Sequence, residues 1–153
     1  MAYTGPVMAL HLLKLCVGPS SIEELEARIA HYRAEALRLG HAPETVHVTR
    51  MFPKRAGAIA GGGSIYWVMK GTLCCRQSIR AIEPVTGSDG IDRCRLVLDP
   101  AVTPVSPRPC RPFQGWRYLE ARDAPADLDR ASAGEVAEMP ESLRRELVAL
   151  GLI

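Results

Sequence analysis

Two stretches of this chain place aromatic rings among positively charged side chains, a combination that suits planar anionic ligands. The first is the segment 49–55, in which Arg50, Lys54 and Arg55 surround Phe52. Cations in this arrangement grip phosphates while the ring stacks on a base. The alternative is a solvated surface loop that Phe52 anchors to the core.

The second stretch, residues 108–119, is the densest group of such side chains. Arg111 and Arg117 supply guanidinium planes. Gln114 adds an amide edge, and Trp116 adds a ring for stacking. Alternatively, the aromatic side chains close the core while the arginines pair with carboxylates of the chain. Both roles can hold at once, because a strand has two faces.

Between these stretches, residues 64–70 predict a strand that follows the glycine run 61–63. Tyr66 and Trp67 face opposite sides of that strand, so at most one of them is expected in the core. The other needs a second surface, either a helix or a ligand. The glycines lack the spacing of a P-loop and precede a strand rather than a helix, which argues against nucleotide hydrolysis of that type. The predicted ligand-binding residues are Arg50, Lys54, Arg55, Tyr66, Trp67, Lys70, Arg76, Arg111, Gln114, Trp116 and Arg117.

Reactive groups are sparse, and no catalytic residue is predicted. His11 lies in an apolar strand and is predicted to be a hydrogen-bonded core histidine. His47, on the strand that enters the basic segment, is the one histidine near plausible chemistry, and Cys75 is its candidate partner. The five cysteines include no C-x-x-C pair, so no metal site is predicted and reduced thiols of a cytoplasmic protein are expected.

The charge is concentrated in the middle of the chain. Residues 46–122 hold twelve of the nineteen basic residues against five acidic ones, a net charge of +7, whereas residues 123–153 carry −4. This asymmetry indicates an anionic partner, and RNA or a nucleotide is the predicted one. No cofactor is predicted.

The length and composition fit one globular domain. The chain has 153 residues, of which 47% are hydrophobic. We expect a core over residues 7–122 and an acidic, helical C-terminal tail over residues 123–153. No apolar run is long enough to cross a bilayer, and the N-terminus is a poor secretory signal, so no membrane association is expected. The sequence leaves the oligomeric state open.

The hydrophobic periodicity predicts helices near both ends of the chain and strands between them. A buried strand is expected over 7–17, interrupted by Lys14, and a helix follows from a Ser21 capping box with Glu24 to a stop at Gly40. A helical turn is expected over 56–60. The remaining strands are predicted over 46–50, 64–70, 73–83, 93–99 and 113–119, and a last helix over 140–150. Five prolines between residues 100 and 112 are expected to keep that stretch extended and mostly outside regular pairing. The predicted fold class is α+β, with a small mixed or antiparallel β-barrel, or a strongly curved sheet, and flanking helices.

Several blocks of the chain resemble a bacterial family catalogued as domain of unknown function 1489. The blocks are residues 8–18, 47–55, 62–71, 93–100 and 111–119, and the match continues over 123–128. This resemblance covers nearly the whole chain and implies no particular activity. In the order of its elements the chain also looks like the small barrels of the PUA-like and ASCH-like groups, which implies a cleft that binds RNA or a modified base.

These observations favour a non-catalytic module that binds RNA, another nucleic acid or a nucleotide in a basic aromatic cleft. Two alternatives remain. One is a small enzyme acting on a phosphorylated or nucleotide substrate through His47 or Cys75, which would hold the reactive group in a concave pocket. The other is a protein–protein adaptor that uses the acidic tail.

Overall fold

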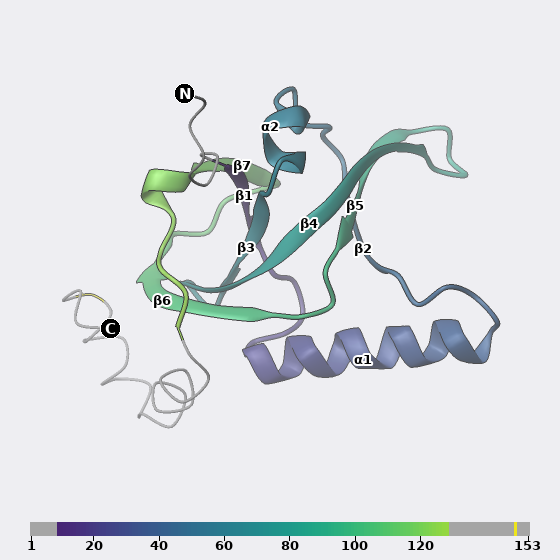
Figure 1. Ribbon diagram of the computed structural model, residues 1–153, viewed down its shortest axis with the longest axis horizontal. Coiled ribbons are helices and arrows are strands. Elements are labelled where there is room, and N and C mark those ends of the chain that lie inside the picture. The colour runs from purple at the N-terminus through teal and green to yellow at the C-terminus, as the bar shows by residue number, and fades with distance from the viewer. Residues whose placement is uncertain (1–8, 129–148, 150–153) are drawn as a thin grey trace, which may run out of the picture.

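The longest strand, β4 (Thr72–Thr86), organises the sheet because it pairs with three other strands. The computed structural model describes residues 9–128 and residue 149. In it, the first half of β4 lies between β3 (Ser64–Met69) and β6 (Thr103–Pro109). Its second half pairs with β5 (Asp92–Leu98), and the two strands project together as a long hairpin (Figure 1).

Three further strands extend the sheet on both sides. β2 (Thr45–Thr49) pairs with β5 and forms one edge. On the other side, β1 (Leu10–Leu15) runs parallel to β3, and β7 (Trp116–Glu120) runs antiparallel to β1. Among the described residues the strand order is β2-β5-β4-β3-β1-β7, with β6 attached to β4. The α+β class is confirmed, with a mixed sheet at its centre.

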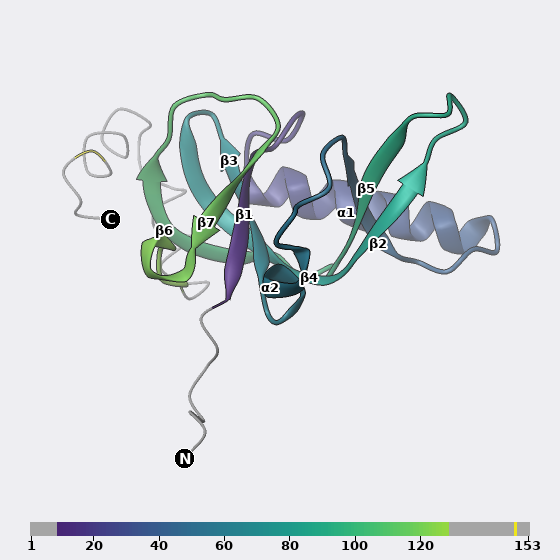
Figure 2. The same cartoon turned by 90° about the horizontal axis from the view of Figure 1, so that it is seen from above.

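The sheet is open, so of the two predicted arrangements, a β-barrel or a strongly curved sheet, the barrel is wrong. β6 and β7 lie at the same end of the molecule, opposite β2 and β5 (Figure 2), but no ladder joins them in the described chain. After β7 the short helix η1 (Ala121–Asp123) redirects the backbone, and only an isolated bridge between Val105 and Asp127 reaches β6. The resemblance to PUA-like barrels is not confirmed.

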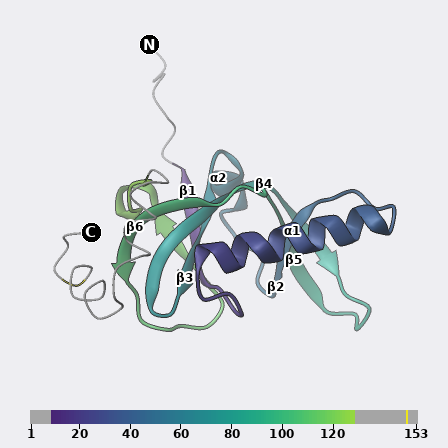
Figure 3. The same cartoon turned by 90° about the horizontal axis from the view of Figure 1, so that it is seen from below.

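Helix α1 (Ile22–Arg38) covers one face of the sheet. The Ser21 hydroxyl accepts a hydrogen bond from the Glu24 amide at 3.1 Å, as predicted, whereas the Glu24 carboxylate reaches back to Ser20 rather than to Ser21. Leu25 is the buried residue of this helix. Figure 3 shows the helix passing along the sheet toward β5 and β2. Its second half exposes Tyr32 and Leu37, so only its first turns are firmly packed.

Both faces of β3 are buried, and the molecule therefore has two apolar clusters. Trp67 belongs to the larger one, between the sheet and α1, together with Leu12 and Leu96. Tyr66 belongs to the smaller one, with Val105 of β6. Both rings are buried, although at most one was expected in the core. A helix was one of the two second surfaces predicted for the other ring, and α1 covers Trp67, while β6 and the chain around β7 cover Tyr66.

Two local features of the sequence explain how β3 is positioned. Lys70 and Gly71 have φ values of 48° and 75°, and they form the tight turn predicted between β3 and β4. Before β3, the short helix α2 (Ala56–Ala60) ends close to the sheet. A Cβ atom on Gly63 would lie 2.3 Å from the Leu10 carbonyl oxygen, so only glycine allows this approach.

The proline-rich stretch is extended, as predicted, but the expectation that it stays mostly outside regular pairing is wrong. Residues 103–109 form β6, which pairs with β4 in a ladder with one irregularity. Prolines are accommodated because β6 has a ladder on one side only, and edges and bulges tolerate residues that lack an amide hydrogen. The predicted last helix over 140–150 and the N-terminal residues 1–7 lie outside the described residues, apart from residue 149.

Candidate ligand pocket

A cavity of about 390 Å³ lies between α1 and the sheet, and we call it the α1 pocket. Its walls come from α1, from the end of β1, from β2 and the residue before it, and from β3, β4 and β5. Its volume is in the range of small-molecule sites in proteins. Because α1 is closely packed only near its first turns, the space beneath its middle is not filled by side chains.

Three cationic side chains line the α1 pocket, namely Lys14, Arg28 and Arg33. In the described chain the ion pairs are made by Arg38, Arg55, Arg76, Arg80, Arg93 and Arg95, so the three pocket cations have no carboxylate within ion-pair distance. The one acidic residue of the lining, Glu44, is paired with Arg95. The pocket lining therefore carries three cations against one carboxylate, and none of the three cations is in an ion pair within the described chain.

Backbone carbonyl groups hold the two arginines in place. Arg28 donates to the carbonyl oxygen of Val17 at 2.8 Å, and Arg33 donates to that of Pro43. A guanidinium has five N–H donors, so each side chain is positioned and still has donors to offer. Burial lowers the pKa of Lys14, and an anion beside it would favour its charged form.

His47 stands on the β2 wall of the pocket, edge-on to Trp67 with ring centroids 5.1 Å apart. Burial, aided by the charges of Lys14 and Arg28, lowers the pKa of His47 to about 4. Its imidazole is therefore neutral at physiological pH. The buried Nε2 atom has no hydrogen-bond partner among the described residues.

Two further polar groups complete the wall. The buried hydroxyl of Thr45 also has no partner within the described chain. Trp67 donates its indole N–H to Gln77 at 2.9 Å, and Gln77 in turn donates to the Asp99 carbonyl at 2.9 Å. The indole is thus fixed, whereas Thr45 and His47 keep hydrogen-bonding capacity. Unpaired buried polar atoms are rare in folded proteins, and a bound ligand is one way to satisfy them.

The residues predicted from the sequence to bind a ligand do not gather in this pocket. Only Trp67 among them lines it. Tyr66 is buried in the smaller apolar cluster, and Lys70 is exposed in the β3–β4 turn. Arg117 lies over the ring of Phe113 at 4.4 Å, while Arg111 and Gln114 are exposed in the segment before β7.

The two aromatic basic stretches do meet at one point. The indole N–H of Trp116 donates to the Met51 carbonyl at 2.8 Å, and the Arg55 amide donates to the Tyr118 hydroxyl at 3.1 Å. Arg55 also pairs with Glu120 at 3.2 Å. We call this the loop–β7 surface, formed by residues 50–55 with Trp116, Tyr118 and Glu120. Arg50, Lys54 and Phe52 are exposed on it.

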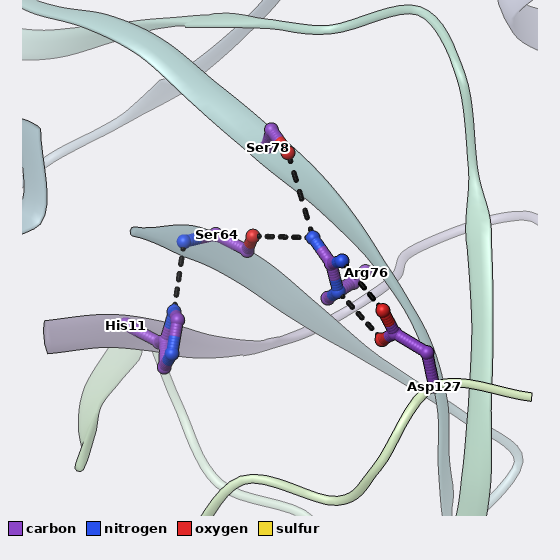
Figure 4. Close-up of polar contacts among 5 residues, drawn as sticks. All are labelled: His11, Ser64, Arg76, Ser78 and Asp127. Atoms are coloured by element: carbon purple, nitrogen blue, oxygen red, sulfur yellow. Dashed lines mark hydrogen bonds and ion pairs between the residues drawn. The ribbon is translucent and has the colours of Figure 1, made fainter. Parts of the chain in front are cut away.

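Arg76 belongs to a separate polar cluster (Figure 4). It makes a bidentate ion pair with Asp127, with both N–O distances at 2.8 Å, and donates to Ser64 at 2.9 Å. The Ser64 amide in turn donates to Nδ1 of His11, so the predicted hydrogen bond of His11 is present, although the residue is half-buried and not in the core. This cluster holds the chain after η1 against β4. Arg76 therefore has a structural partner.

Cys75 is unsuited to nucleophilic chemistry. It is buried, and a hydrogen bond with Cys74 together with burial raises its pKa strongly. A thiol in that state is not a thiolate at neutral pH. No hydrogen bond joins it to His47 in the described structure, so the predicted candidate pair is not assembled.

Lys14, Arg28, Arg33 and Thr45 were missed by sequence reasoning. Lys14 could have been identified from the sequence, since it is the one charged residue in an otherwise apolar strand. Arg28 and Arg33 look like ordinary polar residues of an amphipathic helix. In the described residues there is no group of three or more His, Cys, Asp or Glu side chains that could hold a metal ion. No described helix is long and apolar enough to span a membrane.

Comparison with known proteins identifies the family. A family model described as "Protein of unknown function (DUF1489)" matches residues 12–153, so the chain belongs to that family. The resemblance seen in the sequence is thereby confirmed. Searches of curated proteins and of solved structures find no match.

Proposed function

We propose that this member of the DUF1489 family binds a small phosphorylated ligand, of the size of a mononucleotide, in the α1 pocket. One observation carries the proposal: three cations without acidic partners in the described chain line a cavity, and two other lining residues, Thr45 and His47, each have a buried polar atom without a partner there. Structural ion pairs and solvated surface charges do not produce that combination. It is the arrangement expected where a ligand supplies the missing charge and hydrogen bonds.

Each part of the pocket has a role in this proposal. Arg28 and Arg33, held by backbone carbonyls, donate to phosphate oxygens, and Lys14 adds a further charge. The buried polar atoms of Thr45 and of the neutral His47 reach a hydroxyl or a ring nitrogen of the ligand after their side chains turn toward the pocket. The side of the pocket near Trp67 accommodates an apolar or planar part of the ligand.

The perturbed His47 also favours a second function, the enzyme that the sequence left open. A histidine of lowered pKa in a concave pocket is the feature that distinguishes an enzyme from a binding module. Neutral His47 can accept a proton from a nucleophile next to a bound phosphate. Release of inorganic phosphate or of a nucleoside by wild-type protein, and its loss in His47→Asn, would identify this activity.

Nucleic-acid binding remains a proposal for the loop–β7 surface. The observation in its favour is that exposed Arg50, Lys54 and Phe52 lie on a segment anchored to Trp116. Affinity for a single strand would fall as salt rises, with a log–log slope of about −0.7 per phosphate contact. The adaptor alternative concerns the acidic tail, most of which lies outside the described residues.

The main proposal is tested by isothermal titration with AMP and with pyrophosphate at low ionic strength. We expect saturable binding by the wild-type protein and a loss of affinity of about 10- to 100-fold in Lys14→Gln, because a charge-assisted contact contributes roughly 1.5–3 kcal/mol. Lys70→Gln is the matched control, since it removes the same charge from the exposed turn.

Two results would contradict the proposal. One is the absence of binding of AMP, pyrophosphate and a sugar phosphate at millimolar concentration. The other is an equal loss of affinity in Lys14→Gln and Lys70→Gln, which would show that the anion responds to overall charge and not to the pocket.

A further inference from the structure

Exposed large hydrophobic residues are concentrated in one segment of the described chain. Of the nine large hydrophobic residues exposed in the described chain, seven lie between positions 32 and 52. They are Tyr32, Leu37, Leu39, Val46, Val48, Met51 and Phe52. Exposed apolar side chains that lie next to each other are typical of protein–protein contacts, and Val46 and Val48 are neighbours on one face of β2.

β2 lies within this segment and has a free edge. It pairs with β5 on one side, in a ladder with no irregularity from Thr45 to Thr49, and no described strand pairs with its other side. Natural edge strands are usually protected by lysine, proline or a bulge. β2 has none of these, and its Val46 and Val48 are exposed.

The sequence of β2 is symmetric about His47. Residues 45–49 are Thr-Val-His-Val-Thr, which reads the same in both directions. The residues that flank them, Glu44 and Arg50, carry opposite charges. Two copies of this strand in antiparallel register, centred on His47, would place identical or complementary residues opposite each other at every position.

We propose that two copies of the chain associate through their β2 strands to form a symmetric dimer with a continuous sheet. In that register Thr45 lies opposite Thr49 of the second copy, and Val46 lies opposite Val48. Such cross-strand pairs stabilise antiparallel sheets. A two-fold axis through His47 repeats every contact, as an isologous interface requires.

Charge complementarity fixes the register. Glu44 lies opposite Arg50 of the second copy at both ends of the paired strands. Arg50 is exposed and makes none of the ion pairs of the described chain, and the Glu44 side chain is half exposed beside Arg95. A shift of the register by two residues would separate these charges and leave a valine opposite either Arg50 or Glu44. The inference does not depend on the ligand of the α1 pocket.

The test uses charge reversal followed by mixing, with mass measured by light scattering or sedimentation. At micromolar to millimolar concentrations the wild-type protein is expected to form a dimer, with a measured mass twice that of the 16.7 kDa chain. Arg50→Glu places Glu44 opposite a glutamate, and Glu44→Lys places a lysine opposite Arg50. For each variant alone, the dissociation constant of the dimer is expected to be about tenfold or more higher than for the wild type, because like charges that face each other repel.

An equimolar mixture of the two variants is expected to restore the dimer. In the mixed pair the introduced lysine faces the introduced glutamate at one end, and the native Glu44 faces the native Arg50 at the other. Recovery in the mixture also shows that both variants are folded. Arg122→Glu, a charge reversal on η1 away from β2, is the matched control and is expected to behave as wild type. A monomeric wild-type protein at millimolar concentration, or a mixture that remains monomeric, would overturn the proposal.

Discussion

The α1 pocket and the loop–β7 surface both combine cations with aromatic rings, but they differ in what their polar groups already contact. On the loop–β7 surface Arg55 is paired with Glu120, and the Trp116 indole is bonded to the backbone. In the α1 pocket three cations have no acidic partner in the described chain, and Thr45 and His47 retain unused hydrogen-bonding atoms. A ligand site is thus distinguished by unsatisfied groups in a concave space, more than by the local density of basic residues.

The largest expected effect is a difference in stability between variants of the two tryptophans. From the sequence, either ring was a candidate for stacking on a ligand. Trp67 is 2% exposed and packs in the larger apolar cluster, so we expect Trp67→Ala to cost about 3–5 kcal/mol in the free energy of unfolding. Trp116 is only partly buried, so Trp116→Ala should cost clearly less. Urea unfolding of both variants measures the difference. Equal losses would mean that the loop–β7 surface is as much a part of the core as β3.

The second expected effect is a pH dependence of stability that arises from His47 in the α1 pocket. The pKa of His47 is about 4 in the folded protein and about 6.5 in the unfolded chain. The unfolded state therefore binds the extra proton between these values, and stability falls as pH drops from about 6.5 toward 4. The lowered pKa of His47 reduces the free energy of unfolding by about 3 kcal/mol once the pH is below both values, since one pKa unit corresponds to roughly 1.4 kcal/mol.

Unfolding free energies measured from pH 7 to pH 4 on the wild type and on His47→Asn test this expectation. The variant should lose much of the acid-induced destabilisation, while His31→Asn, at an exposed position of α1, should retain it. Identical pH profiles for the wild type and His47→Asn would place His47 in a solvated environment and would weaken the case for the pocket.

Local signals in the sequence were sufficient for much of the fold. The serine cap and the glycine stop located α1, and the Lys70-Gly71 turn located the β3–β4 hairpin, because each depends on residues a few positions apart. The proline-rich β6 was missed because its pairing with β4 is tertiary and overrides the local preference of proline. Closure into a barrel was wrongly expected for a similar reason, since it depends on where the chain runs after β7.

The candidate site was less accessible to sequence reasoning. His47 was recognised as the histidine nearest to plausible chemistry, and Trp67 as a candidate ring. The cations beside them come from β1 and from α1, outside the basic middle segment, and the crossing of α1 over the sheet brings them together. The middle segment, by contrast, places several of its arginines in ion pairs, as Arg76 with Asp127 and Arg95 with Glu44 and Glu83 show.

The measurement that tests the central claim most directly is a titration of isotope-labelled protein with AMP, followed by NMR. The α1 pocket predicts that the imidazole of His47 and the indole N–H of Trp67 shift together and saturate, while the indole N–H of Trp116 stays unchanged. Shifts confined to Trp116 and residues 50–55, or no saturable shift at His47 and Trp67, would contradict the assignment of the ligand site to the pocket.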